Sequence, residues 1–313
     1  MRWAILRTSA QPWGVERVKP KTGLHRGIPA DEYHDEWDAV NCSTLKLFAG
    51  DFAAEVSDAH ARAVLTSPPK DSAAFRVGRA VHAAVGEPEE FAKGWVAAPK
   101  LNRRTKDGRK AWADFEAANS SREVLTADEF AQVNAIKVSV LTHPIGRRLY
   151  KEPGEAELSF VWEREVEGFG PVLCKGRADR FTVFEGTPVV VDLKTTENAS
   201  PGEDGFVRQV GKYNMAMQAA WYLDGLNAVA PAERRFLFLA VEKKPPFAVC
   251  VHELDQWSLE SGRIQCERLL ARYCNAMKTE TWAGYPNVVN QLELPPWTRR
   301  KMEGDSFDDI FDY

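Results

Sequence analysis

The sequence predicts a mixed α/β fold, in which a central mixed sheet is flanked by helices and the N-terminal half is mostly helical. Three observations predict it. Apolar residues of the first half recur at helical spacing, residues 156–196 show strand patterns, and helix and strand patterns alternate from residue 210. The order helices, three strands, helix, two strands, helix favours one sheet covered by helices.

Three helix patterns occupy the first half, at residues 41–51, 72–86 and 126–143. Asn41 or Ser43 can cap the first of them. The third is the best defined, because Thr126 and Glu129 have the spacing of a capping box and Pro144 follows its end.

Three strand patterns follow, at residues 156–165, 170–184 and 187–196. The second contains a possible break at Gly176. Their close succession predicts an antiparallel meander. The remaining elements are a helix over residues 210–226 that ends at Gly225, two strands around Pro245 and Pro246, and a helix over residues 258–280.

Charge is distributed unevenly along the 313 residues, whose net charge is −4. The last eleven residues hold five acidic residues and no basic one, and without those five the chain has 41 basic and 40 acidic residues. Residues 100–110 carry six basic residues and one acidic residue, a concentration that can bind phosphates. A solvated surface loop is the alternative interpretation of this segment.

Several classes of protein are disfavoured. The five cysteines are scattered and form no CxxC pair, which argues against disulfides, a zinc finger or an iron–sulfur cluster. No run of about 18 apolar residues is present, and the first residues lack the apolar core of a signal peptide. We therefore expect a cytoplasmic protein without a membrane partner.

Residues 189–198 raise a chemical question, because a strand places Asp192 and Lys194 on one face and Val191 and Leu193 on the other. A buried charge needs a partner, which can be the other charge, a metal ion or water. Asp179 on the preceding strand supplies a second carboxylate, and two carboxylates suit Mg²⁺. An ordinary surface salt bridge is the alternative.

Six segments together resemble a known family, the exonuclease VIII (RecE-type) exodeoxyribonucleases of the PD-(D/E)XK nuclease superfamily. They appear in that family's order and read GRAVH, VAAPKLNRRTKDGRK, EAELSFVWE, CKGRADRF, VVDLKTT and YNMAMQAAWYLDGL. The resemblance spans about Gly23 to Trp297. It departs from the superfamily pattern at Ala178, where a proline is expected before the first aspartate.

The resemblance implies a PD-(D/E)XK nuclease fold and assigns roles to individual residues. His82, Asp179 and Asp192 become metal ligands for Mg²⁺, for which Mn²⁺ is expected to substitute, and Lys194 becomes the catalytic lysine. Without the resemblance, a histidine among Ala and Val on a helix is more often a packed core residue.

Three further residues receive supporting roles. Glu157 matches an acidic residue often found near the site, and Gln218 and Tyr222 match a QxxxY helix motif that supports the active site and the DNA strand. An amphipathic helix whose tyrosine merely packs is the alternative for the last two.

DNA binding is expected to be independent of sequence, because the chain has no base-reading helix or zinc finger and phosphate contacts dominate such affinity. Trp221 and Tyr222 are candidates to stack on a displaced base. The predicted phosphate-binding residues are Arg103, Arg104, Lys106, Arg109, Lys110, Lys175 and Arg177.

The family's activity implies digestion of linear double-stranded DNA from 5′ to 3′ by a ring-like homo-oligomer. The 3′ single strand that remains would pass to a single-strand annealing protein in recombination, in a bacterial or phage setting. The alternatives are an endonuclease, a RecB-like nuclease module, or a non-catalytic protein that binds DNA ends. We expect an irregular segment over residues 1–40, a single nuclease domain over 41–300 and an acidic tail over 301–313.

Overall fold

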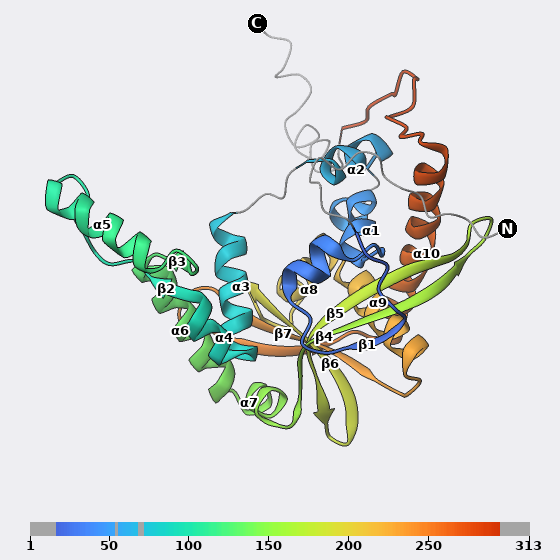
Figure 1. The fold of residues 1–313 in the computed structure, drawn as a ribbon. Coiled ribbons are helices and arrows are strands. Elements are labelled where there is room, and N and C mark those ends of the chain that lie inside the picture. The colour runs from blue at the N-terminus through green and yellow to red at the C-terminus, as the bar shows by residue number, and fades with distance from the viewer. Residues whose placement is uncertain (1–16, 54–55, 68–71, 295–313) are drawn as a thin grey trace, which may run out of the picture.

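The computed structural model describes residues 17–53, 56–67 and 72–294, and it contains the predicted central sheet (Figure 1). Within these residues the main sheet has six strands, in the order β1-β4-β5-β6-β7-β8. The strands are β1 (Gly23–His25), β4 (Gly154–Val166), β5 (Gly170–Phe184), β6 (Thr187–Thr196), β7 (Arg235–Glu242) and β8 (Val249–Glu253). Neighbouring strands are antiparallel except β6 and β7, which are parallel, so the predicted mixed sheet is confirmed.

The antiparallel meander β4-β5-β6 is also confirmed, and its second turn shows why it forms. Glu185 and Gly186 both have positive φ, 54° and 81°, as a two-residue hairpin turn of type I′ requires. The turn sets the register in which Phe184 pairs with Thr187. The predicted break at Gly176 is wrong, because β5 continues through this residue.

Helices cover both faces of the sheet (Figure 1). Val189, Val191 and Leu193 of β6 belong to the apolar cluster that includes α3 and α6, whereas Val190 belongs to the cluster that includes α1, α9 and α10. The helices are α1 (Cys42–Ala49), α2 (Asp58–Leu65), α3 (Ala73–Gly86), α4 (Pro88–Gly94), α5 (Lys106–Ala118), α6 (Ala127–Thr142), α7 (Pro144–Lys151), α8 (Phe206–Lys212), α9 (Met215–Val229) and α10 (Gln256–Thr279). The alternation along β6 therefore directs Asp192 and Lys194 toward α1 and α9.

The helix ends follow local capping chemistry in two of the predicted cases. The Asn41 side chain accepts a hydrogen bond from the Thr44 backbone N–H at 2.8 Å and caps α1. Thr126 and Glu129 form the predicted capping box of α6. The helix predicted over residues 210–226 is wrong at both ends, because α8 ends at Lys212, α9 begins only at Met215, and α9 continues past Gly225 to Val229.

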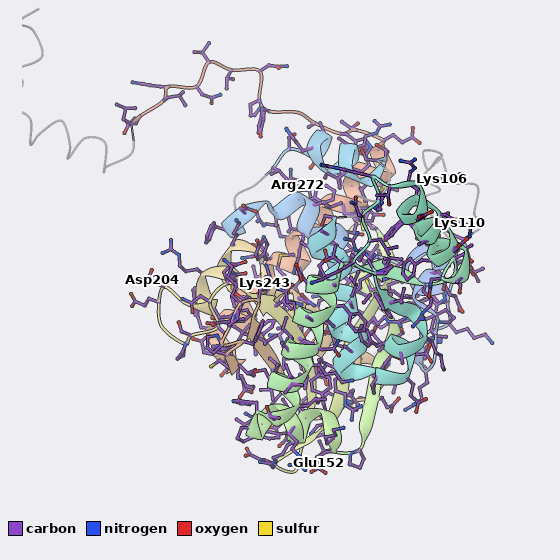
Figure 2. All side chains as sticks on the ribbon, turned by 90° about the vertical axis from the view of Figure 1, so that its left-hand side faces the viewer. Lys106, Lys110, Glu152, Asp204, Lys243 and Arg272 are labelled. Carbon is purple, nitrogen blue, oxygen red and sulfur yellow. The ribbon has the colours of Figure 1, made fainter. Side chains whose placement is uncertain are left out.

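A basic arm, which we define as residues 100–118, projects from the rest of the molecule (Figure 1). It consists of a turn followed by α5, a helix in which no residue is buried. Figure 2 looks onto this side of the molecule and shows Lys106 and Lys110 on the arm. The small parallel sheet of β2 (Trp95–Ala97) and β3 (Glu123–Leu125) lies at its base.

The N-terminal segment is partly regular within its described residues. Residues 17–40, which we expected to be irregular, include β1 and a helical turn over Glu32–Glu36. The acidic tail over residues 301–313 lies outside the described residues, and the domain boundaries stay a prediction. Across the described part of the chain, we find no helix with both the length and the apolar character needed to span a membrane.

Candidate metal centre and active site

The candidate site lies where strands β5 and β6 separate. Their last paired positions are Arg180 and Val191, so Asp179 and Asp192 are the next residues on each strand. The Asp179 carboxylate accepts a hydrogen bond from the Leu193 backbone N–H at 2.8 Å, in place of the partner strand. The end of the pairing therefore brings two carboxylates together.

Glu157 on β4 adds a third carboxylate through an unusual backbone conformation. The pairs Ala156–Arg180 and Leu158–Ala178 flank it, so it lies opposite Asp179 on the neighbouring strand. Its φ of 51° is rare for a non-glycine residue and takes it out of the regular ladder. Such strain persists only where the surrounding structure enforces it, and it is concentrated at functional sites.

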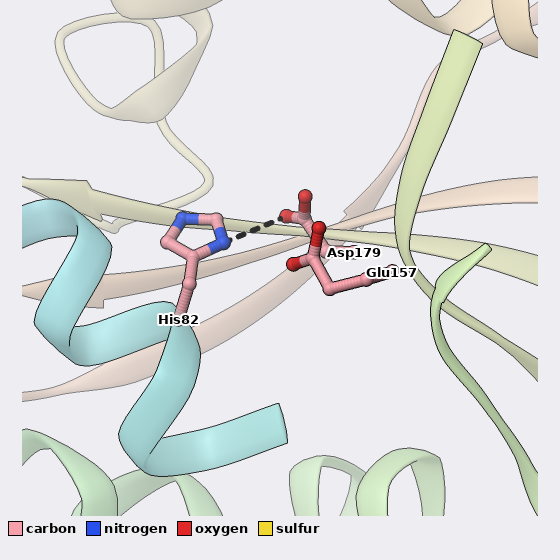
Figure 3. Close-up of side chains that lie close together, drawn as sticks. All are labelled: His82, Glu157 and Asp179. Atoms are coloured by element: carbon pink, nitrogen blue, oxygen red, sulfur yellow. Dashed lines mark ion pairs between the residues drawn. The ribbon is translucent and has the colours of Figure 1, made fainter. Parts of the chain in front are cut away.

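The helix α3 brings His82 to these carboxylates (Figure 3). His82 Nδ1 lies 3.2 Å from Asp179 Oδ2. One potential ligand atom from each of His82, Glu157 and Asp179 lies within 4.8 Å of the other two. Two carboxylates and an imidazole form a donor set that fits a divalent cation such as Mg²⁺ or Mn²⁺.

Asp192 has a different environment from the other two carboxylates. Its side chain is 1% exposed, and its Oδ2 lies 2.5 Å from Lys194 Nζ. Its Oδ1 accepts a hydrogen bond from Gln218 Nε2 at 2.7 Å. The structure thus groups Glu157 with His82 and Asp179 and holds Asp192 between a lysine and an amide. The predicted role of Asp192 as a metal ligand stays a prediction.

The pKa values of Glu157 and Asp192 reflect burial and the crowding of carboxylates, whereas at Asp179 burial is outweighed by the effects of His82 and Lys194, which lower the pKa. Burial raises the pKa of Glu157, and the Asp179 charge raises it further. Burial likewise raises the pKa of Asp192, although the Lys194 ammonium opposes this effect. Burial alone would lower the pKa of His82, but the Asp179 carboxylate raises it overall. Neighbouring carboxylates repel one another when both are ionised, and a bound divalent cation would relieve this repulsion.

Gln218 and Tyr222 occupy one face of α9, as their spacing predicts. Gln218 orients Asp192 through the hydrogen bond described above, whereas the Tyr222 ring packs edge-on against Phe160. Trp221 is fully buried, and its Nε1 donates to the Lys175 carbonyl at 3.0 Å. The prediction that Trp221 stacks on a base is therefore wrong, because its ring is enclosed by the core.

Two of the predicted phosphate-binding residues have other partners. Lys175 is 3% exposed, and its ammonium donates to the carbonyls of Tyr33 and Trp37, so it cannot reach a phosphate and that prediction is wrong. Arg177 donates to Glu157 at 2.5 Å and to the Ile28 carbonyl at 2.9 Å, which places it beside the metal-ligand candidates.

The remaining predicted phosphate-binding residues lie on the basic arm. They are Arg103, Arg104, Lys106, Arg109 and Lys110, and all are exposed. The Arg103 guanidinium lies over the Trp112 ring, 4.3 Å from its centroid. The Lys110 ammonium pairs with Asp114 at 2.8 Å, and both side chains are mostly exposed. The arm therefore presents cations to solvent, whereas those at the site are enclosed.

Sequence reasoning missed Lys46 on α1. Its Nζ donates to Gln218 Oε1 at 3.4 Å, on the opposite side of the amide from Asp192. No motif or periodicity singles it out, because its position depends on how α1 packs against α9.

The mixed sheet, with carboxylates and a lysine at the point where two strands separate, defines a PD-(D/E)XK-type domain, the fold of a nuclease superfamily. A family model described as "PDDEXK-like domain of unknown function (DUF3799)" matches residues 41–294. This chain belongs to that family.

Among solved structures that are similar to this chain, one shows the same fold. A protein from Eubacterium rectale, crystallised as a "putative exonuclease", is similar over 90% of this chain and 100% of its own, with a TM-score of 0.58 and 13% identity. SSO0001 has a TM-score of 0.29 at 14% identity, covering 67% of this chain and 86% of its own. VC1899 from Vibrio cholerae has a TM-score of 0.20 at 11% identity, covering 68% and 54%. No curated protein matches the chain.

Proposed function

We propose that this chain is a Mg²⁺-dependent exodeoxyribonuclease of the RecE type, which digests linear double-stranded DNA from 5′ to 3′. The 3′ single strand that it leaves would serve an annealing protein in recombination. One observation carries the nuclease proposal: His82, Glu157 and Asp179 converge beside the buried pair of Asp192 and Lys194. The order of the RecE-like segments supports the finer assignment.

The side chains divide the work of phosphodiester hydrolysis. His82, Glu157 and Asp179 would hold the divalent cation, which supplies charge neutralisation at the phosphate and activation of water when bound. His82 must be deprotonated at its ligating nitrogen to bind the cation. Lys194 is positioned to hold the attacking water or to neutralise the phosphate, and Gln218 keeps the Asp192 carboxylate in orientation.

Two substitutions test this assignment. We expect Asp192→Ala and Lys194→Ala each to lower the cleavage rate of linear duplex DNA by roughly 10³-fold or more, because the first removes the carboxylate that positions Lys194 and the second removes the ammonium itself. Lys194→Ala should still bind DNA ends, as measured by fluorescence anisotropy. Circular dichroism checks that both variants are folded. Cleavage at wild-type rates by either variant would contradict the role given to this pair.

A non-catalytic DNA-end-binding protein is the second candidate function. The exposed cations of the basic arm favour it, because they support affinity for DNA whether or not the site cleaves. The two candidates differ in a cleavage assay across divalent metals. DNA-end binding without cleavage in Mg²⁺ or Mn²⁺ would favour the second candidate.

A further inference from the structure

Lys46 differs from the other cations of the site in its partner. Lys194 pairs with Asp192 and Arg177 pairs with Glu157, both at 2.5 Å. The Lys46 ammonium instead donates to the Gln218 amide oxygen at 3.4 Å. Within residues 17–53, 56–67 and 72–294, no carboxylate forms an ion pair with it.

This environment is costly for a charged group. Burial lowers the pKa of Lys46 and the nearby Lys194 ammonium lowers it further, whereas Cys42 and the Asp192 carboxylate oppose this shift only in part. A partly buried ammonium in a site of low polarity normally has an anionic partner, because an amide dipole replaces only part of its hydration. The folded protein therefore maintains a cation at this position at a cost in stability.

The helix that carries Lys46 is firmly held. Asn41 caps α1, and its neighbours Leu45 and Phe48 are fully buried in the core. A functional side chain on such an element keeps its position more precisely than one on a loop. Lys46 is thus fixed beside Gln218.

The arrangement around Asp192 separates two cations. Lys194 contacts one carboxylate oxygen of Asp192, and the Gln218 amide donates to the other. The Lys46 ammonium in turn donates to the oxygen of that amide. The two ammonium groups therefore lie on different sides of Asp192. A polyanion that passes the site can meet both of them with different phosphates.

We propose that Lys46 is a substrate-binding residue that contacts a phosphate of the cleaved strand other than the scissile phosphate. This proposal rests on the proposed nuclease function and specifies how the same site binds its DNA substrate. The phosphate supplies the anionic partner that the folded protein lacks at Lys46. A charge-assisted hydrogen bond of this kind also fixes the position of the strand relative to Lys194.

The test pairs Lys46→Met with DNA in which one phosphate at a time is replaced by a neutral methylphosphonate. We expect Lys46→Met to lower cleavage of ordinary linear duplex roughly 10–100-fold, as loss of one charged contact does. At one linkage, the methylphosphonate should lower the cleavage rate of the wild type by a similar factor. At the same linkage it should not lower the cleavage rate of Lys46→Met below its rate on ordinary DNA. Additive losses at every linkage would overturn the proposal.

Stability separates this role from a structural one. We expect Lys46→Met to have a Tm equal to or above that of the wild type, because it removes a cation without a carboxylate partner. Lys46→Arg should retain part of the activity and the same sensitive linkage. Lys93→Met is the matched control, since Lys93 is exposed and paired with Glu90 on α4. A lowered Tm that accounts for the lost activity would overturn the proposal.

A binding measurement distinguishes failure of this proposal from failure of the nuclease function. The same set of DNAs is titrated in EDTA, where cleavage does not interfere. If the wild type cleaves DNA but the effects of the methylphosphonate and of Lys46→Met are independent at every linkage, in both cleavage rate and affinity, only the role proposed for Lys46 is wrong. If the wild type cleaves nothing in any divalent metal, the nuclease proposal is wrong. The DNA affinities in EDTA then decide whether Lys46 contacts a phosphate, because the methylphosphonate should weaken binding to the wild type but not to Lys46→Met.

Discussion

Gly176 lies beneath the ring of Phe160 on the adjacent strand. A Cβ at this position would fall well inside contact distance of the ring carbons. The register pairs the two residues directly, so neither can move away without disturbing β4 and β5. The glycine is thus required for close packing one strand position from Arg177 and three from Asp179.

We therefore expect Gly176→Ala to destabilise the protein by about 1–3 kcal/mol through overpacking. Gly78→Ala on α3 is the matched control, since a Cβ there meets nothing within 4 Å. It should be neutral or stabilising by about 0.5–1 kcal/mol, because alanine favours a helix. Urea unfolding of both variants measures the difference. Equal free energies of unfolding for the two would contradict this account of the glycine.

Single residues also show where sequence reasoning ended. Asp179, Asp192 and Lys194 were predictable as neighbours, because strand alternation and the short meander place them together. Lys175 was misassigned since its burial depends on the distant segment of Tyr33 and Trp37, whose carbonyls bind its ammonium. Lys46 was missed for the same physical reason: its position depends on tertiary packing.

The elements of the second half were predicted more completely than those of the first, where α2, α4 and α7 have no predicted counterpart. The strands β5 and β6 have the predicted bounds, because β-branched and alternating residues specify them locally. The end of α9 was wrong because Gly225 serves another purpose. A Cβ on Gly225 would meet the Trp162 ring, so the glycine allows α9 to approach the sheet and does not end the helix.

The basic arm is the element to which we assign electrostatic binding of DNA. Its residues Arg103, Arg104, Lys106 and Arg109 are exposed, so replacing all four by Gln should not disturb the core. We expect weaker DNA binding, with the slope of log K against log [salt] reduced by up to about 3–4, roughly 0.9 for each lost phosphate contact. Fluorescence anisotropy at several salt concentrations measures this slope.

The matched control for the arm replaces four exposed basic residues elsewhere by Gln: Lys93, Lys151, Arg208 and Lys244. The net charge of the two variants is the same, so a general electrostatic effect lowers the slope equally in both. An equal reduction in the two variants would contradict a specific role for the arm.

In the whole molecule, helices cover both faces of the mixed sheet with apolar side chains. The charged groups of the site converge where β5 and β6 separate. The fold class was predictable because it follows from the order of local patterns. The grouping of Glu157 with His82 and Asp179 was not, since it depends on the positive φ of Glu157 opposite Asp179. The family of the chain fixes the fold and leaves the reaction to be tested.

Digestion of linear duplex DNA labelled at the 5′ or the 3′ end is the decisive test of the proposed exonuclease function. The reactions contain Mg²⁺ or EDTA, and covalently closed circular DNA serves as the control substrate. We expect loss of the linear duplex in Mg²⁺ but not in EDTA, early release of the 5′ label and an intact circle. Cleavage of the circle, or an intact linear duplex in every divalent metal, would contradict it.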